Sequence, residues 1–175
     1  MTNERSFPPY TYTPGATPHP ISDPRGHAYG RRNEGLVVVD VSRVEECESY
    51  QHGLKLFRHG YYWEAHEEWE AAWHAVGRTG VVADYLKGLI KLAAVGVKVR
   101  EGNGEGVRRH ARRAAELFSA VAQATPGADQ FAGQLLQHLV GAAQTLASSE
   151  DPCPGLDHGR PVVFWPDLLG RPAGL

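Results

Sequence analysis

The residues best suited to chemistry lie in one segment, 61–74, which reads YYWEAHEEWEAAWH. The spacing of its apolar residues predicts a helix of about four turns. His66 and Glu70 stand four residues apart, so their side chains share a face of that helix and can meet. Imidazole and carboxylate groups bind divalent metals such as zinc, and they also exchange protons. We therefore expect the chemistry of this chain to centre on this helix.

The segment from His66 to Glu70 reads H-E-x-x-E, which differs in one position from the zinc-protease pattern H-E-x-x-H. Two interpretations stay open. In the first, His66 and Glu70 hydrogen-bond to each other as a coupled polar pair at the floor of a small pocket. In the second, they bind a divalent metal ion, with a third ligand from elsewhere in the chain.

The predicted pocket includes further groups around this pair, with Glu67 and His74 at its rim. Another histidine, on a helix expected over 105–122, points inward and could approach the pair. The predicted pocket residues are His66, Glu67, Glu70, Trp63, His74 and His110, and the predicted metal ligands are His66 and Glu70. No residue is assigned a catalytic role.

Three additional candidates lie in the N-terminal segment, where His19, Asp23 and His27 recur at intervals of four residues. The prolines around them restrict the backbone, so the three side chains could present ligands to a common centre. The alternative is that they make the local hydrogen bonds that are typical of turns.

The periodicity of apolar residues predicts an all-α fold, a compact bundle of about five helices in antiparallel pairs. The expected helices cover 42–60, 61–76, 82–100, 105–122 and 128–147. Ser42 and Glu45 form a capping-box pattern at the first start, and Gly60 is expected to end that helix. Trp69 and Trp73 are expected in the core.

The flanking segments have a different composition. We expect an extended Pro/Gly-rich arm over 1–40, a helical domain over 41–148, and a short C-terminal tail over 149–175 that packs on the core. Large apolar residues in the arm should pack on the helices as well. The runs 36–39 and 161–165 are β-branched or aromatic, and we predict that they pair as a two-stranded ribbon.

The overall composition excludes several classes of protein. The 175 residues carry a formal net charge of −2, which does not favour binding to nucleic acid. Two cysteines are too few for a disulfide scaffold. The chain lacks a secretory signal and a membrane-length apolar run, so we expect a cytoplasmic protein with no membrane partner. It also lacks phosphate-loop and serine-hydrolase motifs. The partners are otherwise unknown, and a homo-oligomer is compatible with the sequence.

Three motifs in order resemble a known family, the prokaryotic domain of unknown function 309. The first is the stretch 57–73, which contains the aromatic-Glu-Ala-His-Glu helix. The second is the Gly-Leu-Ile helix over 85–94, and the third is the turn at 100–103 with the helix that follows. The resemblance covers about residues 48–118. It implies a small all-helical domain and no established activity.

Two functions follow as hypotheses. The leading one is a binding or scaffold module with a His/Glu polar pocket on its second helix. The alternative is a metal-dependent hydrolase or related enzyme centred on His66, Glu67 and Glu70, with a divalent metal such as zinc as its cofactor.

Overall fold

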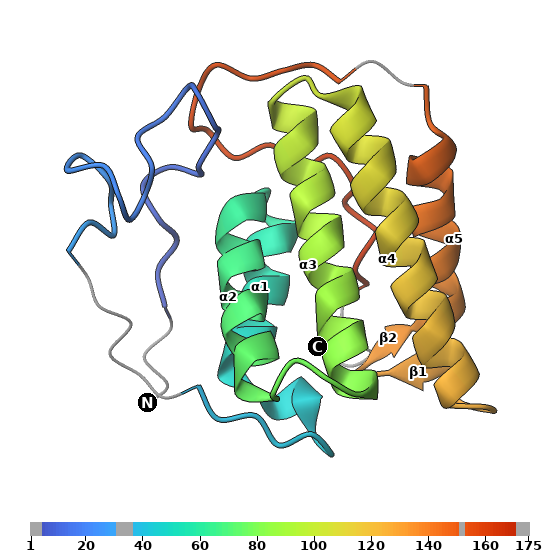
Figure 1. Cartoon of the computed structure of the whole chain (residues 1–175). Helices are drawn as coiled ribbons and strands as arrows, with labels where there is room; N and C mark the ends of the chain where they lie inside the picture. The colour runs from blue at the N-terminus through green and yellow to red at the C-terminus, as the bar shows by residue number, and fades with distance from the viewer. Residues whose placement is uncertain (1–4, 31–36, 151–152, 171–175) are drawn as a thin grey trace.

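The structure is a computed structural model that describes residues 5–30, 37–150 and 153–170. These residues form a compact bundle of five α-helices with one small two-stranded sheet, which confirms the predicted all-α fold (Figure 1). The elements are η1 (Val44–Glu46), α1 (Glu48–Arg58), α2 (Tyr62–Ala75), α3 (Val81–Arg100), α4 (Gly104–Ala124), β1 (Gln130–Phe131), β2 (Gln134–Leu135) and α5 (Leu136–Ser148).

Each helix packs on the next one in the chain, from α1 through to α5. Most connections are short, so neighbouring helices must run in opposite directions. The turn after α1 shows how the sequence produces this reversal of direction. Gly60 has a φ of 82°, and its N–H donates to the carbonyl of Phe57, while the N–H of Tyr61 donates to that of Leu56. This pair of bonds is a Schellman motif, and it ends α1 where expected.

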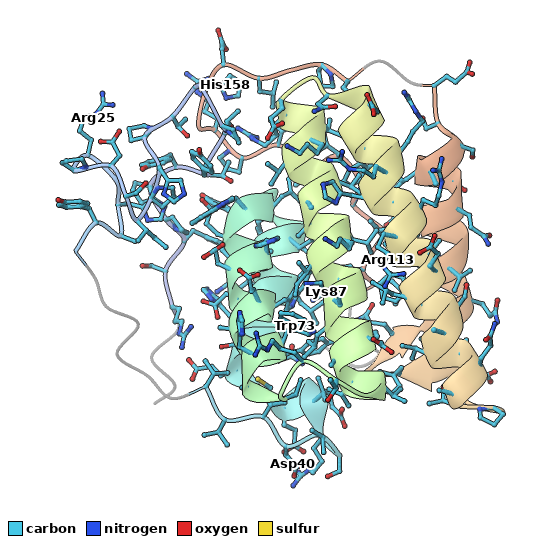
Figure 2. The ribbon with its side chains drawn as sticks, in the orientation of Figure 1. Arg25, Asp40, Trp73, Lys87, Arg113 and His158 are labelled. Carbon is cyan, nitrogen blue, oxygen red and sulfur yellow. The ribbon has the colours of Figure 1, made fainter. Side chains whose placement is uncertain are left out.

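Only one of the two tryptophans predicted for the core is fully buried. Trp69 has no exposed surface, and its indole N–H donates to the carbonyl of Tyr50 at 3.2 Å. The ring lies so close to α1 that a Cβ at Gly53 would approach Trp69 Nε1 to 2.3 Å. Trp73 was wrongly assigned, because it is half-buried near the end of α2. Its ring lies under the ammonium of Lys87 on α3, 3.7 Å from the ring centre (Figure 2).

Two predicted helix starts are wrong for local reasons. The N–H and hydroxyl of Ser42 both donate to Asp40 Oδ1, at 2.9 and 2.6 Å, so Ser42 forms a turn instead of a capping box. Helix α1 begins six residues later, at Glu48. The fifth helix begins at Leu136, since the residues before it form the β1–β2 hairpin. Ala132 and Gly133 in its turn have positive φ values, which end any helical run.

The predicted ribbon between 36–39 and 161–165 does not form in the described residues, where 37–39 and 161–165 contain no strand. Residue 36 lies outside the described part. The second run instead packs on the start of α2. Phe164 donates its N–H to the hydroxyl of Tyr62 at 2.8 Å and stacks on the Tyr62 ring. Gly60 leaves room for this run, because a Cβ there would lie 2.6 Å from the carbonyl oxygen of Val162.

The N-terminal arm, which is residues 5–30 of the described chain, lies beside α2 (Figure 1). Phe7 stacks on Tyr61 with ring centres 5.1 Å apart. Further along, the N–H of Thr11 donates to the carbonyl of Gly159 at 2.9 Å, so the arm and the C-terminal tail are in direct contact. The segments before and after the bundle are therefore packed together at one end of it.

Two buried charged side chains hold this junction. Glu64 on α2 accepts a hydrogen bond from the hydroxyl of Thr11 at 2.6 Å and one from the N–H of Tyr12 at 2.9 Å. Arg100, the last residue of α3, donates from Nε to the hydroxyl of Thr13 at 2.7 Å. Its two other nitrogens donate to the carbonyls of Arg160 and His158, at 3.1 and 2.6 Å.

The described residues contain no helix that is long and apolar enough to cross a membrane.

Replacement of Glu64 by Ala should release the arm. The change removes two hydrogen bonds to a charged group, each worth about 1.5–3 kcal/mol, and favours the helix itself. A loss of about 1.4 kcal/mol or more raises the open population of the arm about tenfold. Trypsin should then cleave after Arg25 at least about ten times faster under native conditions, as followed by mass spectrometry. Glu105→Ala, an exposed glutamate on α4, is the matched control. Equal cleavage rates in the two variants would contradict this account of the junction.

Candidate functional site

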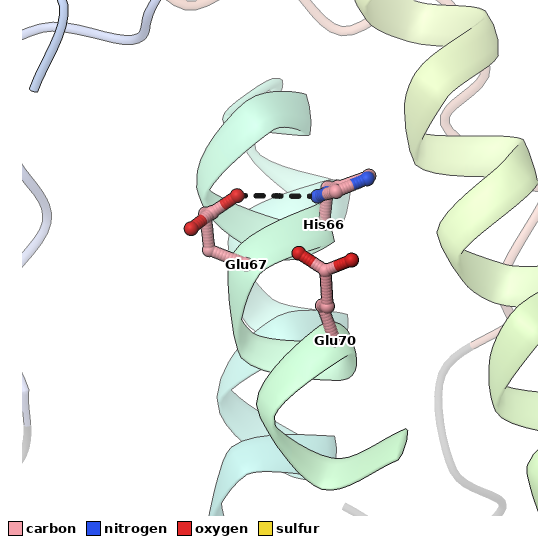
Figure 3. Close-up of side chains that lie close together, drawn as sticks. All are labelled: His66, Glu67 and Glu70. Atoms are coloured by element: carbon pink, nitrogen blue, oxygen red, sulfur yellow. Dashed lines mark ion pairs between the residues drawn. The ribbon is translucent and has the colours of Figure 1, made fainter. Parts of the chain in front are cut away.

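The polar residues of α2 fall on two sides of its buried stripe. At 100° per residue, Glu64, Glu67 and Ala71 project opposite Trp69. His66 and Glu70 project between these two directions, on the side of α3 (Figure 3). The helix therefore presents one polar surface to the arm and another toward α3 and α4, and Glu67 stands between them.

The first surface forms the floor of a cavity of about 810 Å³ between the arm and helices α1 and α2. Of the predicted site residues, Trp63, Glu67, His74 and His27 line it, whereas His66, Glu70 and His110 do not. The full lining is Arg5, Pro8, Ile21, His27, Ala28, Val37, Ser49, His52, Leu56, Trp63, Glu64, Glu67, Glu68, Ala71, His74 and Ala75.

The second surface holds a cluster of three potential metal ligands. One donor atom from each of His66, Glu67 and Glu70 lies within 4.8 Å of the others (Figure 3). All three side chains are half-buried. The predicted pairing of His66 with Glu70 is wrong in detail, because His66 Nδ1 forms its ion pair with Glu67 Oε1, at 3.3 Å. The geometry of that contact is not a hydrogen bond, so the buried Nδ1 atom has no hydrogen-bond partner.

His110 on α4 lies within electrostatic reach of this cluster. Burial lowers the pKa of His110 from 6.5 to about 4, and the positive charges of Lys91 and Arg109 add to the shift, with a smaller effect from His66. His110 is therefore neutral at physiological pH, with a lone pair available on its ring. Burial and the neighbouring Lys87 likewise lower the pKa of Lys91, and the carboxylate of Glu70 opposes that shift.

Two of the three arm candidates make turn hydrogen bonds. The Nδ1 atom of His19 accepts from the N–H groups of Ile21 and Ser22, at 3.2 Å each. Asp23 accepts from the N–H and the guanidinium of Arg25, and these bonds lower the pKa of the Asp23 carboxyl. His27 is different, since it lines the cavity and its Nε2 atom lies 3.8 Å from Glu64 Oε1.

The sequence analysis did not predict a series of contacts between charged side chains on one side of the cavity. His52 Nδ1 lies 3.0 Å from Glu68 Oε1. The guanidinium of Arg5 also binds Glu68, at 3.0 Å, and it binds Glu48 at 2.9 Å. One signal was present in the sequence, because Glu64, Glu68, Ala71 and Ala75 recur at helical spacing on one side of α2. Small residues among carboxylates indicate a surface that another segment can approach closely.

One family model matches the chain, and its description is Domain of unknown function (DUF309). It covers residues 50–110, which includes all six predicted pocket residues and leaves out the arm and the tail. The resemblance inferred from the motifs is confirmed for this segment. No curated protein and no solved structure matches the chain.

The low pKa of His110 predicts a loss of stability in mild acid. The unfolded chain takes up a proton on this residue near pH 6.5, whereas the folded protein does so only near pH 4. The free energy of unfolding should therefore fall as the pH is lowered from 7 to 5, since the unfolded state binds more protons in that range. Solvent screening at a half-buried site limits this contribution to about 1 kcal/mol. His110→Gln should lose correspondingly less stability than the parent protein in urea unfolding at pH 7 and pH 5. Equal losses in the two proteins would contradict the assignment.

Proposed function

We propose that this protein is a binding module that takes a small ligand into the cavity between the arm and helices α1 and α2. The observation that carries the proposal is the cavity itself. Its volume of about 810 Å³ lies in the range of small-molecule sites, about 300–1,000 Å³. A match to a family of unknown function adds no activity, and the shape and the chemistry of the cavity walls support the binding function.

The composition of the walls supports this function. The walls combine apolar side chains such as Ile21 and Trp63 with charged and imidazole groups, which is the mixture that fixes both the affinity and the orientation of a ligand. The floor belongs to two helices that pack on the core through fully buried residues such as Trp69. A floor of this kind holds its polar groups in fixed positions before a ligand arrives.

A cavity-filling substitution tests this proposal. Ala71 lies on the floor, and Ala71→Trp should occupy the cavity without disturbing the core side of α2. Fragments that raise the melting temperature of the parent protein should fail to stabilise this variant. Ala120→Trp, at an exposed position on α4, is the matched control and should respond as the parent does. A broad fragment library that stabilises none of the proteins, or all three equally, would show that the cavity is not a ligand site.

A second candidate function is supported by the cluster on the other side of α2. The donors of His66, Glu67 and Glu70 are one imidazole nitrogen and two carboxylate oxygens, a set that suits zinc or manganese. A metal ion bound there would act as a Lewis acid and activate water for hydrolysis, as in the metal-dependent hydrolase hypothesis. The positive charge of Lys91 close to Glu70 opposes a divalent ion, which is why this function ranks second.

Calorimetric titration of metal-free protein with Zn²⁺ and Mn²⁺ tests the second candidate. One ion should bind per chain, His66→Ala should abolish binding, and Glu70→Gln should weaken it by about tenfold or more, or about 1.4 kcal/mol. His74→Ala, an exposed histidine on the same helix outside the cluster, should bind as the parent does. Absence of heat in the parent protein would exclude a metal centre at these residues.

A further inference from the structure

The charges on the cavity walls are unbalanced. Among the described residues that line the cavity are three carboxylates, those of Glu64, Glu67 and Glu68, against a single guanidinium, that of Arg5. Arg5 is already committed, because it binds Glu68 and also Glu48. A cleft with an excess of one charge attracts ligands of the opposite sign. The cavity therefore favours a cation over an anion.

The three carboxylates differ in how much hydrogen-bonding capacity they have left. Glu64 is buried and accepts from the arm with both oxygens. Glu68 accepts from Arg5 with both oxygens and also contacts His52. Glu67 has only the 3.3 Å contact with His66 among the residues that the structure describes, and 37% of its side chain is exposed. A carboxylate offers about four acceptor positions, so Glu67 is the group that can receive new donors.

The imidazole of His52, which lines the same wall, has one ring nitrogen without a hydrogen-bond partner in the described part of the chain. Its Nδ1 atom faces a carboxylate that can only accept, so Nδ1 carries the proton in the neutral ring. The Nε2 atom then holds a lone pair, and it is buried without a hydrogen-bond partner. This atom is too enclosed to meet a ligand directly, so the accessible acceptor on the wall is the carboxylate of Glu67, which a ligand with N–H groups complements.

The apolar part of the cavity determines which chemical groups suit the rest of the ligand. Trp63 is half-buried and lies one helical turn from Glu67, and it forms T-shaped ring contacts with Tyr12 and His19 of the arm. An indole ring binds cations through its face as well as apolar groups. Ile21, which is partly exposed, supplies aliphatic surface. A ligand with a cationic head and a short apolar body satisfies both parts of the wall.

We propose that the cavity binds a small organic cation, an ammonium or guanidinium group on an apolar body, with its head on Glu67. This inference rests on the proposed function, since it requires the cavity to be a ligand site. Neutral and anionic compounds of the same size are the competing ligand classes.

Calorimetry with a matched set of probes tests the charge of the ligand. Phenethylamine is the cation, 2-phenylethanol its neutral counterpart and 3-phenylpropionate its anionic one, all measured with EDTA present to exclude metal ions. Phenethylamine should bind at least about tenfold more tightly than 2-phenylethanol. Ala71→Trp should abolish this binding, because it fills the cavity. The anion should give no measurable binding.

Glu67→Gln separates the role of the carboxylate from that of the cavity shape. The side chain is partly exposed, so the substitution should weaken the binding of phenethylamine about tenfold and leave the binding of 2-phenylethanol unchanged. Glu105→Gln on α4 is the matched control and should leave the binding of both probes unchanged, and circular dichroism checks the fold of each variant.

The outcomes separate the charge of the ligand from the existence of the site. If the neutral or anionic probe binds as tightly as phenethylamine or more tightly, and Ala71→Trp blocks that binding, the preference for a cation is wrong and the cavity is still a ligand site. Binding of phenethylamine that neither Glu67→Gln nor Ala71→Trp affects would also overturn the preference for a cation. If no probe binds and no library fragment responds to Ala71→Trp, both this inference and the proposed function fail.

Discussion

Burial of two opposite charges at one end of the bundle determines where the segments outside the helices lie. Glu64 and Arg100 are almost completely buried, at 6% and 1% exposure, and a charge in such a place is tolerated only with close polar partners. In the part of the chain that the structure describes, the side-chain hydrogen bonds of Glu64 and Arg100 do not have partners on the other helices. The partners come instead from residues 11–13 of the arm and residues 158–160 of the tail. Burial lowers the pKa of Arg100, and the charge of Glu64 opposes that shift, so the two residues also support each other.

This constraint links the fold to the candidate sites. The arm forms one wall of the cavity, and it lies there because Thr11 and Tyr12 satisfy Glu64. The other wall is the outer face of α2, whose inner face is fixed by Trp69. A single helix thus contributes to the core, to the cavity and to the His66–Glu67–Glu70 cluster, which explains why one short segment contains such an unusual set of residues. Glu67 belongs to both candidate sites, so a metal ion and a ligand head would compete for it.

The parts that were predictable from the sequence depend on local periodicity. The helices, the turn at Gly60 and the burial of Trp69 all follow from apolar spacing or from a residue with a special backbone conformation. The grouping of His66, Glu67 and Glu70 was also accessible, since three positions on one helix fix their own neighbourhood. The partner of His66 was not predictable from the sequence, because the choice between Glu67 and Glu70 depends on side-chain rotamers. The β1–β2 hairpin was missed because its apolar residues continue a helical pattern. The cavity was missed because it depends on contacts between residues more than 50 positions apart, such as Thr11 and Glu64.

Two of the attachments of the arm, those of Arg5 and Thr11, differ in their response to salt. Arg5 is held by ion pairs whose side chains are partly exposed, and dissolved salt weakens such pairs. Thr11 is held by a buried carboxylate that salt screens much less. Salt should therefore loosen the ion pairs of Arg5 before it affects the buried contacts of Thr11. For a ligand bound at the proposed cavity site, weaker contacts of Arg5 would shorten the residence time as ionic strength rises, even where its equilibrium affinity owes nothing to Arg5.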